Sequence, residues 1–248
     1  ERELKIRYQG SLLGQLWALI IPIMMLIVYT FVFSAVFKAR WPGGEGTSST
    51  ANFALNLFAG LIVFNMFAEV ANQSVSLIKV NKNLVDKIVF PLYILPLVQV
   101  ICSAVGAVIS LTVLVIFELI IKGEIPMTIL LTPMIWAPYI LGLISLSWII
   151  SAVGVFIEDI KQVIGVVTTM MMFMSAVFYP VEALPESIRS IAMINPIMVS
   201  IRNTRAITID GRIPDMKGVF IALIITLISS EMCYRIFEKC RRGFADVI

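Results

Sequence analysis

The sequence carries few side chains that could perform catalysis. It contains no histidine, and its three cysteines, Cys102, Cys233 and Cys240, are far apart along the chain. Most zinc sites, histidine-dependent acid–base chemistry and a disulfide framework are therefore excluded. No Gly-Lys dipeptide occurs, so the GxxxxGK[ST] loop that cradles nucleotide phosphates is absent. We predict that the chain is not an enzyme, holds no metal and takes the energy for any work from elsewhere.

The most informative carboxylate belongs to a polar helical face inside an apolar stretch. Asn65, Glu69, Asn72, Gln73 and Ser76 fall within an arc of about 100° at helical spacing. An ionisable group in a membrane span costs several kcal/mol and usually faces the protein interior or water. Two interpretations remain open for this face, a pore lining and a helix–helix hydrogen-bonding seam. A proton-coupled carrier is disfavoured, because only about two intramembrane carboxylates occur and no inverted repeat is visible.

Aromatic residues gather at similar depth in two other apolar stretches. They are Tyr29, Phe33 and Phe37 in the first stretch, and Phe173, Phe178 and Tyr179 at the end of the fifth. Flat aromatic faces could stack on sugar rings. Packing, or the aromatic belt found at membrane interfaces, explains the same pattern, and composition alone favours the belt.

These residues must be positioned by membrane helices. The 248 residues are 59% hydrophobic and 14% charged, with a mean hydropathy of +0.97, which excludes a water-soluble domain. The net charge of +3 and the lack of a basic, aromatic-rich cluster give no sign of nucleic-acid binding. We predict an all-α integral membrane protein with six transmembrane helices. The apolar stretches lie near 16–37, 53–78, 92–121, 128–156, 163–180 and 218–237.

Loop charges predict the orientation of these spans. Six spans place both termini on one side, and that side collects 11 of the 19 Lys and Arg residues. Most of the others belong to the one long connection near 181–217, so the short loops give the clearer bias. The positive-inside rule then predicts that both termini are cytoplasmic. The first apolar run has full length and no small-residue cleavage site, so we expect it to be retained as a span.

Two segments are amphipathic but too short to span. In residues 1–14, Leu4, Tyr8 and Leu12 recur every four residues among charges, which predicts a helix along the cytoplasmic interface. A snorkelling flank of the first span is the alternative. The connection 181–217 predicts two short helices, one from Pro185 to Ile194 and one from Pro196 to about Ile207 with Asn195 as its cap.

That pair of helices mixes isoleucines with arginines, which favours a re-entrant element near a pore mouth over an ordinary extracellular loop. We expect Arg202 and Arg205 to face lipid headgroups or a passing diphosphate. On the cytoplasmic side, the connection 79–87 is short, helix-compatible and mixed in charge. Such a segment is typical of one that inserts into a groove of a partner protein. A solvated loop is the alternative.

An ordered set of motifs along the chain resembles the permease subunit of type-2 ATP-binding-cassette exporters. The motifs are RYQGSLLGQLWALIIP at 7–22, NKNLVDKIVFP at 81–91, Leu95-Pro96, Phe178-Tyr179-Pro180 and Asn195-Pro196. Within that class the chain is similar to lipopolysaccharide O-antigen exporters, with teichoic-acid exporters close. One departure is Glu158-Asp159-Ile160, where the resemblance leads us to expect Arg-Asp-Ile, so the first residue of that ATPase contact has the opposite charge.

The resemblance implies a single permease domain over 1–248 in the bacterial inner membrane. It implies a homodimer with two nucleotide-binding subunits, which bind the ATP and magnesium, and export of a lipid-linked polysaccharide along the dimer axis. Residues 1–14 become the interface helix, 79–87 and 157–162 the cytoplasmic coupling segments, and 185–207 the periplasmic gate.

The resemblance also implies roles for individual residues, and it raises sugar stacking above the belt interpretation. The coupling residues are Asn81, Lys82, Asn83, Leu84, Val85, Asp86, Lys87, Glu158 and Asp159. The channel residues are Tyr29, Phe33, Phe37, Asn65, Glu69, Gln73, Phe173, Phe178 and Tyr179. The gate residues are Pro185, Ile188, Ile191, Asn195, Pro196, Arg202 and Arg205. Two alternatives remain, a type-2 exporter of drugs or other small amphiphiles and, far behind, a membrane transferase acting on lipid-linked sugars.

Overall fold

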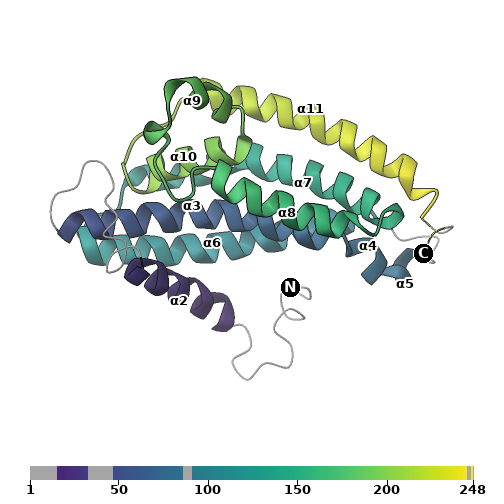
Figure 1. Ribbon diagram of the computed structural model, residues 1–248, viewed down its shortest axis with the longest axis horizontal. Helices are drawn as coiled ribbons and strands as arrows, with labels where there is room; N and C mark the ends of the chain where they lie inside the picture. The colour runs from purple at the N-terminus through teal and green to yellow at the C-terminus, as the bar shows by residue number, and fades with distance from the viewer. Residues whose placement is uncertain (1–15, 33–46, 86–90, 245–246, 248) are drawn as a thin grey trace. The chain divides into compact units, whose positions relative to one another are not determined.

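The computed structural model describes residues 16–32, 47–85, 91–244 and 247. Regular structure in these residues is helical (Figure 1). The helices are α2 (Trp17–Phe31), α3 (Thr47–Ser74), α4 (Leu77–Val80), α5 (Lys82–Val85), α6 (Ile94–Lys122), η3 (Met127–Leu131), α7 (Thr132–Phe156), α8 (Ile160–Met174), η4 (Val181–Ala183), α9 (Glu186–Ala192), α10 (Pro196–Thr208) and α11 (Met216–Arg241). The expectation of an all-helical protein is confirmed for this part of the chain.

Four of the helical segments are long and apolar enough to cross a membrane. They are Ala51–Ser74, Ile94–Lys122, Met127–Phe156 and Met216–Arg241, by length and composition. The first and fifth apolar stretches correspond to shorter apolar helices, Leu19–Phe31 and Ile160–Met174. Six complete spans therefore stay a prediction.

The fifth apolar stretch is not one continuous helix over 163–180, as the hydropathy pattern predicted. α8 ends at Met174, and residues 175–180 form an irregular loop, called loop 175–180 below. Ala176 in this loop has φ of 53°, in the left-handed region that a residue with a Cβ seldom adopts. Hydropathy does not register such a turn, because its side chains are as apolar as those of the helix.

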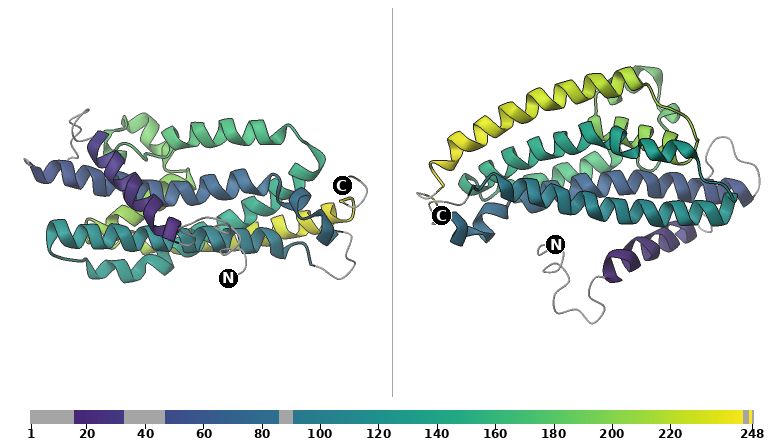
Figure 2. Two further views of the ribbon diagram at one scale, coloured as in Figure 1. Left: turned by 90° about the horizontal axis from the view of Figure 1, so that it is seen from below. Right: turned by 180° about the vertical axis from the view of Figure 1, so that it is seen from behind.

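Local signals explain several helix ends. Gly123, with φ of 75°, follows the last residue of α6, as expected for a left-handed helix cap. Asp215 caps α11 by accepting a hydrogen bond from the backbone N–H of Lys217. α11 is drawn in yellow in Figure 2, where it curves gently along its length.

The chain divides into two compact units, which are described separately. Unit 1 contains the described residues up to Asn65 together with Val105–Thr132 and Phe173–Pro214. Unit 2 contains Met66–Ala104, Pro133–Met172 and the chain from Asp215 onward. The single-domain prediction over 1–248 is not tested by this division.

Unit 2 is held by close helix packing. A Cβ on Gly154 in α7 would collide with the backbone carbonyl of Val75, which directly follows α3, so glycine allows the two backbones to approach. The indole Nε1 of Trp148 donates to the carbonyl of Tyr93 at 3.1 Å, and both rings lie 5.5 Å from the ring of Tyr234 in α11. These contacts join Tyr93, which directly precedes α6, to α7 and α11 within the unit.

Candidate functional site

Three of the predicted channel residues form an aromatic cluster in unit 1, defined as Phe173, Phe178 and Tyr179. The Phe173 and Phe178 ring centroids lie 5.8 Å apart with an interplanar angle of 36°. The Tyr179 hydroxyl donates to the backbone carbonyl of Phe173 at 2.7 Å. Phe173 keeps 58% of its surface exposed. The structure thus brings these three residues together and leaves part of an aromatic face open.

Of the three predicted aromatic residues in the first apolar stretch, the structure describes one. Tyr29 lies in α2 and is half-buried. Phe33 and Phe37 lie outside the described residues. The idea that all six aromatics line one channel therefore stays a prediction.

Arg205 of α10 reaches loop 175–180 with its guanidinium group. Nη1 donates to the carbonyls of Ala176 (2.8 Å) and Tyr179 (3.4 Å), and Nη2 donates to the carbonyl of Val177 (2.7 Å). Nε donates to the carbonyl of Asn56 in α3 at 2.8 Å. A planar guanidinium with five donors is suited to gather several carbonyls in this way. The guanidinium therefore connects α10, α3 and the loop that carries the aromatic cluster.

The expected placement of Arg205 at lipid headgroups or a passing diphosphate is wrong. The residue is 5% exposed and its donors are directed at backbone carbonyls. The cost of removing the guanidinium from water is offset by these hydrogen bonds. Sequence reasoning placed Arg205 near the gate but could not identify carbonyl partners that are distant in sequence.

The two short helices predicted between 185 and 207 are confirmed as α9 and α10. α10 begins at Pro196, and the Asn195 side chain accepts a hydrogen bond from the backbone N–H of Ile197 at 3.0 Å. The same side chain donates to the hydroxyl of Ser175 at 2.9 Å, which ties the cap to loop 175–180. Pro185 directly precedes α9 and is exposed. Entry of these helices into a membrane interface is not tested.

The remaining gate residues have contacts of different kinds. Arg202 is half-buried, and its Nη1 lies 3.2 Å from the sulfur of Met193. Ile188 and Ile191 are in α9, but their side chains are outside the described part of the structure. α9 also contacts the segment before it, since Arg189 Nη2 donates to the backbone carbonyls of Glu182 in η4 and of Leu184 at 2.8 and 3.0 Å.

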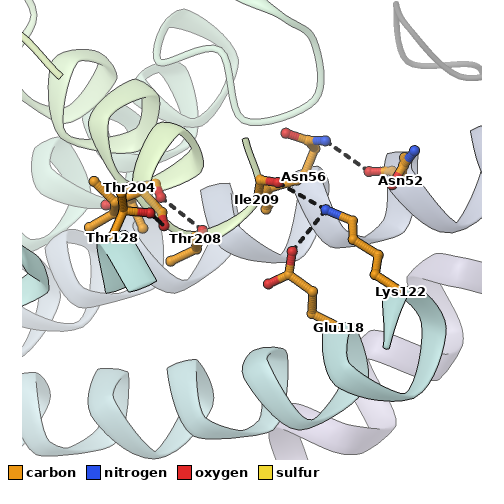
Figure 3. A network of polar contacts seen from close by, with 9 residues as sticks. Asn52, Asn56, Glu118, Lys122, Thr128, Thr204, Thr208 and Ile209 are labelled. Carbon is orange, nitrogen blue, oxygen red and sulfur yellow. Dashed lines mark hydrogen bonds and ion pairs between the residues drawn. The ribbon is translucent and has the colours of Figure 1, made fainter. Parts of the chain in front are cut away.

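The C-terminal end of α10 is held by α6 and by the segment after it. Lys122 Nζ donates to the carbonyl of Ile209 at 2.9 Å and pairs with Glu118 at 2.8 Å, as Figure 3 shows. The Thr128 hydroxyl donates to the carbonyl of Ile207 at 2.6 Å. Helix ends leave carbonyls without intrahelical partners, so these donors complete the end of α10.

The predicted polar face of α3 includes a residue bonded to a neighbouring helix and others that are largely exposed. In unit 2, Glu69 accepts hydrogen bonds from Ser103 of α6 at 3.1 Å and from Gln73 at 3.3 Å. Asn72 donates to the carbonyl of Ala68 at 2.7 Å. Gln73 is largely exposed, as is Asn65 in the part of α3 that belongs to unit 1. Glu69 thus takes part in a helix–helix seam, whereas a pore lining at Asn65 and Gln73 stays a prediction.

A second polar seam in unit 2 was missed from sequence. The hydroxyls of Ser74 in α3 and Ser147 in α7 lie 2.7 Å apart, and Gln99 of α6 donates to the carbonyl of Val70 at 3.3 Å. All three side chains are buried. Small polar residues at regular helical spacing within these stretches were the signal that could have identified the seam.

The predicted coupling segments lie in unit 2. α4 and α5 flank Asn81, and the side chains of Lys82 and Asn83 are exposed. Asp86 and Lys87 lie outside the described residues, as do the side chains of Leu84 and Val85. Glu158 and Asp159 occupy the exposed turn between α7 and α8.

An ion pair connects the two predicted coupling segments. Lys79 Nζ lies 3.1 Å from Glu158 Oε1. Glu158 is the position at which the sequence departs from the expected Arg-Asp-Ile, and this carboxylate has an intramolecular basic partner. No group of three or more His, Cys, Asp and Glu side chains suited to a metal ion occurs in the part of the chain that the structure describes.

Comparison with known proteins gives consistent matches along the chain. The family model described as ABC-2 type transporter matches residues 1–209. The O-antigen export system permease protein RfbA of Myxococcus xanthus is 26% identical over 250 residues, covering 100% of this chain and 93% of that protein. An RfbA of Klebsiella pneumoniae is 25% identical over 249 residues, with 100% and 92% covered. The polysialic acid transport protein KpsM of Escherichia coli is 23% identical over 249 residues, with 96% and 91% covered. Since the family model matches residues 1–209 of 248, this protein belongs to the ABC-2 type transporter family of membrane proteins.

Proposed function

We propose that this chain is the permease subunit of an ATP-driven exporter that moves a lipid-linked polysaccharide, of the O-antigen class, across the bacterial cytoplasmic membrane. The observation that carries the proposal is the full-length similarity to permeases named for O-antigen export. The family match and the apolar helices support a transport role within the membrane. In this role the chain performs no chemical conversion.

In the proposed assembly, two copies of the chain pair with two nucleotide-binding subunits. Those subunits bind ATP and magnesium, because this chain has no Gly-Lys dipeptide and hence no phosphate-cradling loop of that type. The exposed residues around α4, α5 and the 157–159 turn contact the nucleotide-binding subunits. The Lys79–Glu158 ion pair joins these two segments.

The proposed topology has six spans with both termini in the cytoplasm. α2 and α8 are the two short spans, and at 15 residues α8 extends about 22 Å, less than a hydrocarbon core of about 30 Å. Loop 175–180 then completes the crossing. Irregular backbone is tolerated at membrane depth only where protein or water satisfies its polar groups. The carbonyl contacts of Arg205 meet this requirement within unit 1.

The aromatic cluster is proposed to line the glycan path, with α9 and α10 at its outer end. A polysaccharide passing without sequence-specific contacts needs flat surfaces, and the rings of Phe173 and Phe178 lie 5.8 Å apart with Phe173 exposed. The relative named for polysialic acid transport favours a long glycan over a small amphiphile as the substrate class.

Stimulation of ATP hydrolysis tests the proposed function. The chain is purified with the ATPase that copurifies with it, placed in lipid nanodiscs, and assayed with lipid-linked glycans or with small amphiphilic drugs. We expect a lipid-linked glycan to stimulate hydrolysis and the drugs to have no effect. Stimulation by drugs alone would assign the chain to the exporters of small amphiphiles, and chemical conversion of the lipid-linked sugar would indicate a transferase.

A further inference from the structure

Arg205 acts on the backbone on both sides of Phe178. Its Nη atoms donate to the carbonyls of Ala176, Val177 and Tyr179, which surround Phe178 in sequence. These carbonyls belong to an irregular loop, where backbone groups need partners from elsewhere. Ala176 has a left-handed φ of 53°, a conformation that persists only when its surroundings enforce it. The guanidinium therefore fixes one conformation of the loop.

The attachment point of this guanidinium is itself fixed. α10 is tied to loop 175–180 at its first turn by the Asn195–Ser175 hydrogen bond. At its last turn it receives donors from Thr128 and Lys122 (Figure 3). Both ends of α10 are thus held within unit 1, so the Arg205 side chain extends from a rigid helix.

The helix α3, which faces the guanidinium, leaves space for it. A Cβ on Gly60 of α3 would lie 2.6 Å from Arg205 Nη2 and 3.3 Å from the carbonyl oxygen of Val177. Four residues earlier on the same helix, the carbonyl of Asn56 accepts from Nε. Glycine at position 60 leaves the space that the Arg205–Val177 contact occupies.

The loop held in this way presents the aromatic cluster. The Phe178 ring lies 5.8 Å from the Phe173 ring, and Tyr179 Oη donates to the carbonyl of Phe173. We propose that Arg205 is a positioning residue for the glycan-contacting ring of Phe178, acting through the carbonyls on either side of it rather than by touching the glycan. This inference rests on the proposed function for the identity of the ligand, but the positioning itself can be tested without a ligand.

The first experiment measures the position of the ring directly. A 4-fluorophenylalanine is placed at position 178 in the full-length chain copurified with its ATPase, and its ¹⁹F resonance is recorded. Arg205→Met keeps an unbranched side chain but removes every donor, so the resonance should shift or broaden. Arg212→Met is the matched control, because Arg212 is exposed and in the same unit. An unchanged resonance in Arg205→Met would overturn the proposal.

Two milder variants distinguish a loss of ring positioning from a general loss of the fold. Arg205→Lys keeps a charge, but one ammonium lacks the planar fork that serves several carbonyls, so an intermediate shift is expected. Gly60→Ala displaces the guanidinium while retaining Arg205, so its resonance should move in the same direction as that of Arg205→Met. A wild-type resonance in both variants would also contradict the proposal.

The second experiment links position to transport. The half-saturating concentration of lipid-linked glycan for ATPase stimulation should rise about two- to tenfold in Arg205→Met, the range expected for losing one aromatic contact. It should rise no further in Arg205→Met combined with Phe178→Ala than in Phe178→Ala alone. Additive increases would overturn the proposal. If the wild-type complex shows no stimulation by glycan, the proposed function fails, while the ¹⁹F result still decides whether Arg205 positions Phe178.

Discussion

The ammonium group of Lys79 lies 3.1 Å from the carboxylate of Glu158, joining the segment that follows α3 to the turn between α7 and α8. The two residues are 79 positions apart in the sequence. Glu158 is 88% exposed at its side chain, so this pair adds little to stability. The ion pair links two segments that we propose to contact the same partner.

Charge reversal tests that link. Lys79→Glu and Glu158→Lys should each reduce glycan-stimulated ATP hydrolysis in the complex, while the combined reversal restores part of it because the opposite charges face each other again. The free energy of unfolding should change by less than about 1 kcal/mol in every variant. Hydrolysis that is equally low in the single and combined variants would mean that each residue acts on the partner separately.

Packing at Gly154 should be sensitive to a single methyl group. Gly154→Ala places a Cβ against the carbonyl of Val75, and relieving that collision should cost about 1–3 kcal/mol. Gly165→Ala in α8 is the matched control, because a Cβ there meets nothing within 4 Å and helix propensity favours alanine. The melting temperature of the detergent-solubilised complex measures both. Equal melting temperatures would contradict the close approach of the two backbones.

The buried serine pair offers a test of the polar seam in unit 2. Ser74→Ala and Ser147→Ala should each destabilise the protein by about 0.6 kcal/mol, with an upper range near 1.7, as interhelical hydrogen bonds in membranes do. The combined variant should cost less than the sum, since the second substitution removes a partner already lost. Strict additivity, measured by thermal unfolding of the solubilised chain, would show that the hydroxyls are not coupled.

Hydropathy and local signals predicted much of this fold because they depend on nearby residues. The positions of α9 and α10, and the Asn195 cap, followed from prolines and a capping residue at the expected spacing. The end of α8 was missed, because the loop after Met174 is apolar and owes its shape to Arg205 of a distant helix.

The candidate site was less predictable because its contacts depend on residues that are distant in sequence. Residue types identified the aromatic cluster, and the structure brings its members together. The direction of Arg205 could not be predicted, because its carbonyl acceptors depend on tertiary packing and on the space at Gly60. The Ser74–Ser147 pair was missed because the spacing of small polar residues along one helix does not identify their partner on another helix.

Aromatic replacement separates stacking from packing at the proposed glycan path. Phe178→Ala and Tyr29→Ala should weaken export more than assembly, since each stacking contact contributes about 0.5–1.5 kcal/mol. Phe178→Leu restores apolar bulk without a flat ring, and it should stay as defective as the alanine variant. Export that survives Phe178→Leu would favour packing or an interfacial belt. Export and complex yield are measured in the same cells.

The central claim is that this chain moves a lipid-linked glycan only when a separate ATPase drives it. The most direct measurement reconstitutes the chain, with and without the ATPase, in vesicles containing a lipid-linked glycan on the ATPase side. Appearance of the glycan on the opposite side is followed with a membrane-impermeant glycan-binding protein. We predict ATP-dependent transfer only when both proteins are present. ATP hydrolysis or glycan transfer by the contaminant-free chain alone would contradict the account.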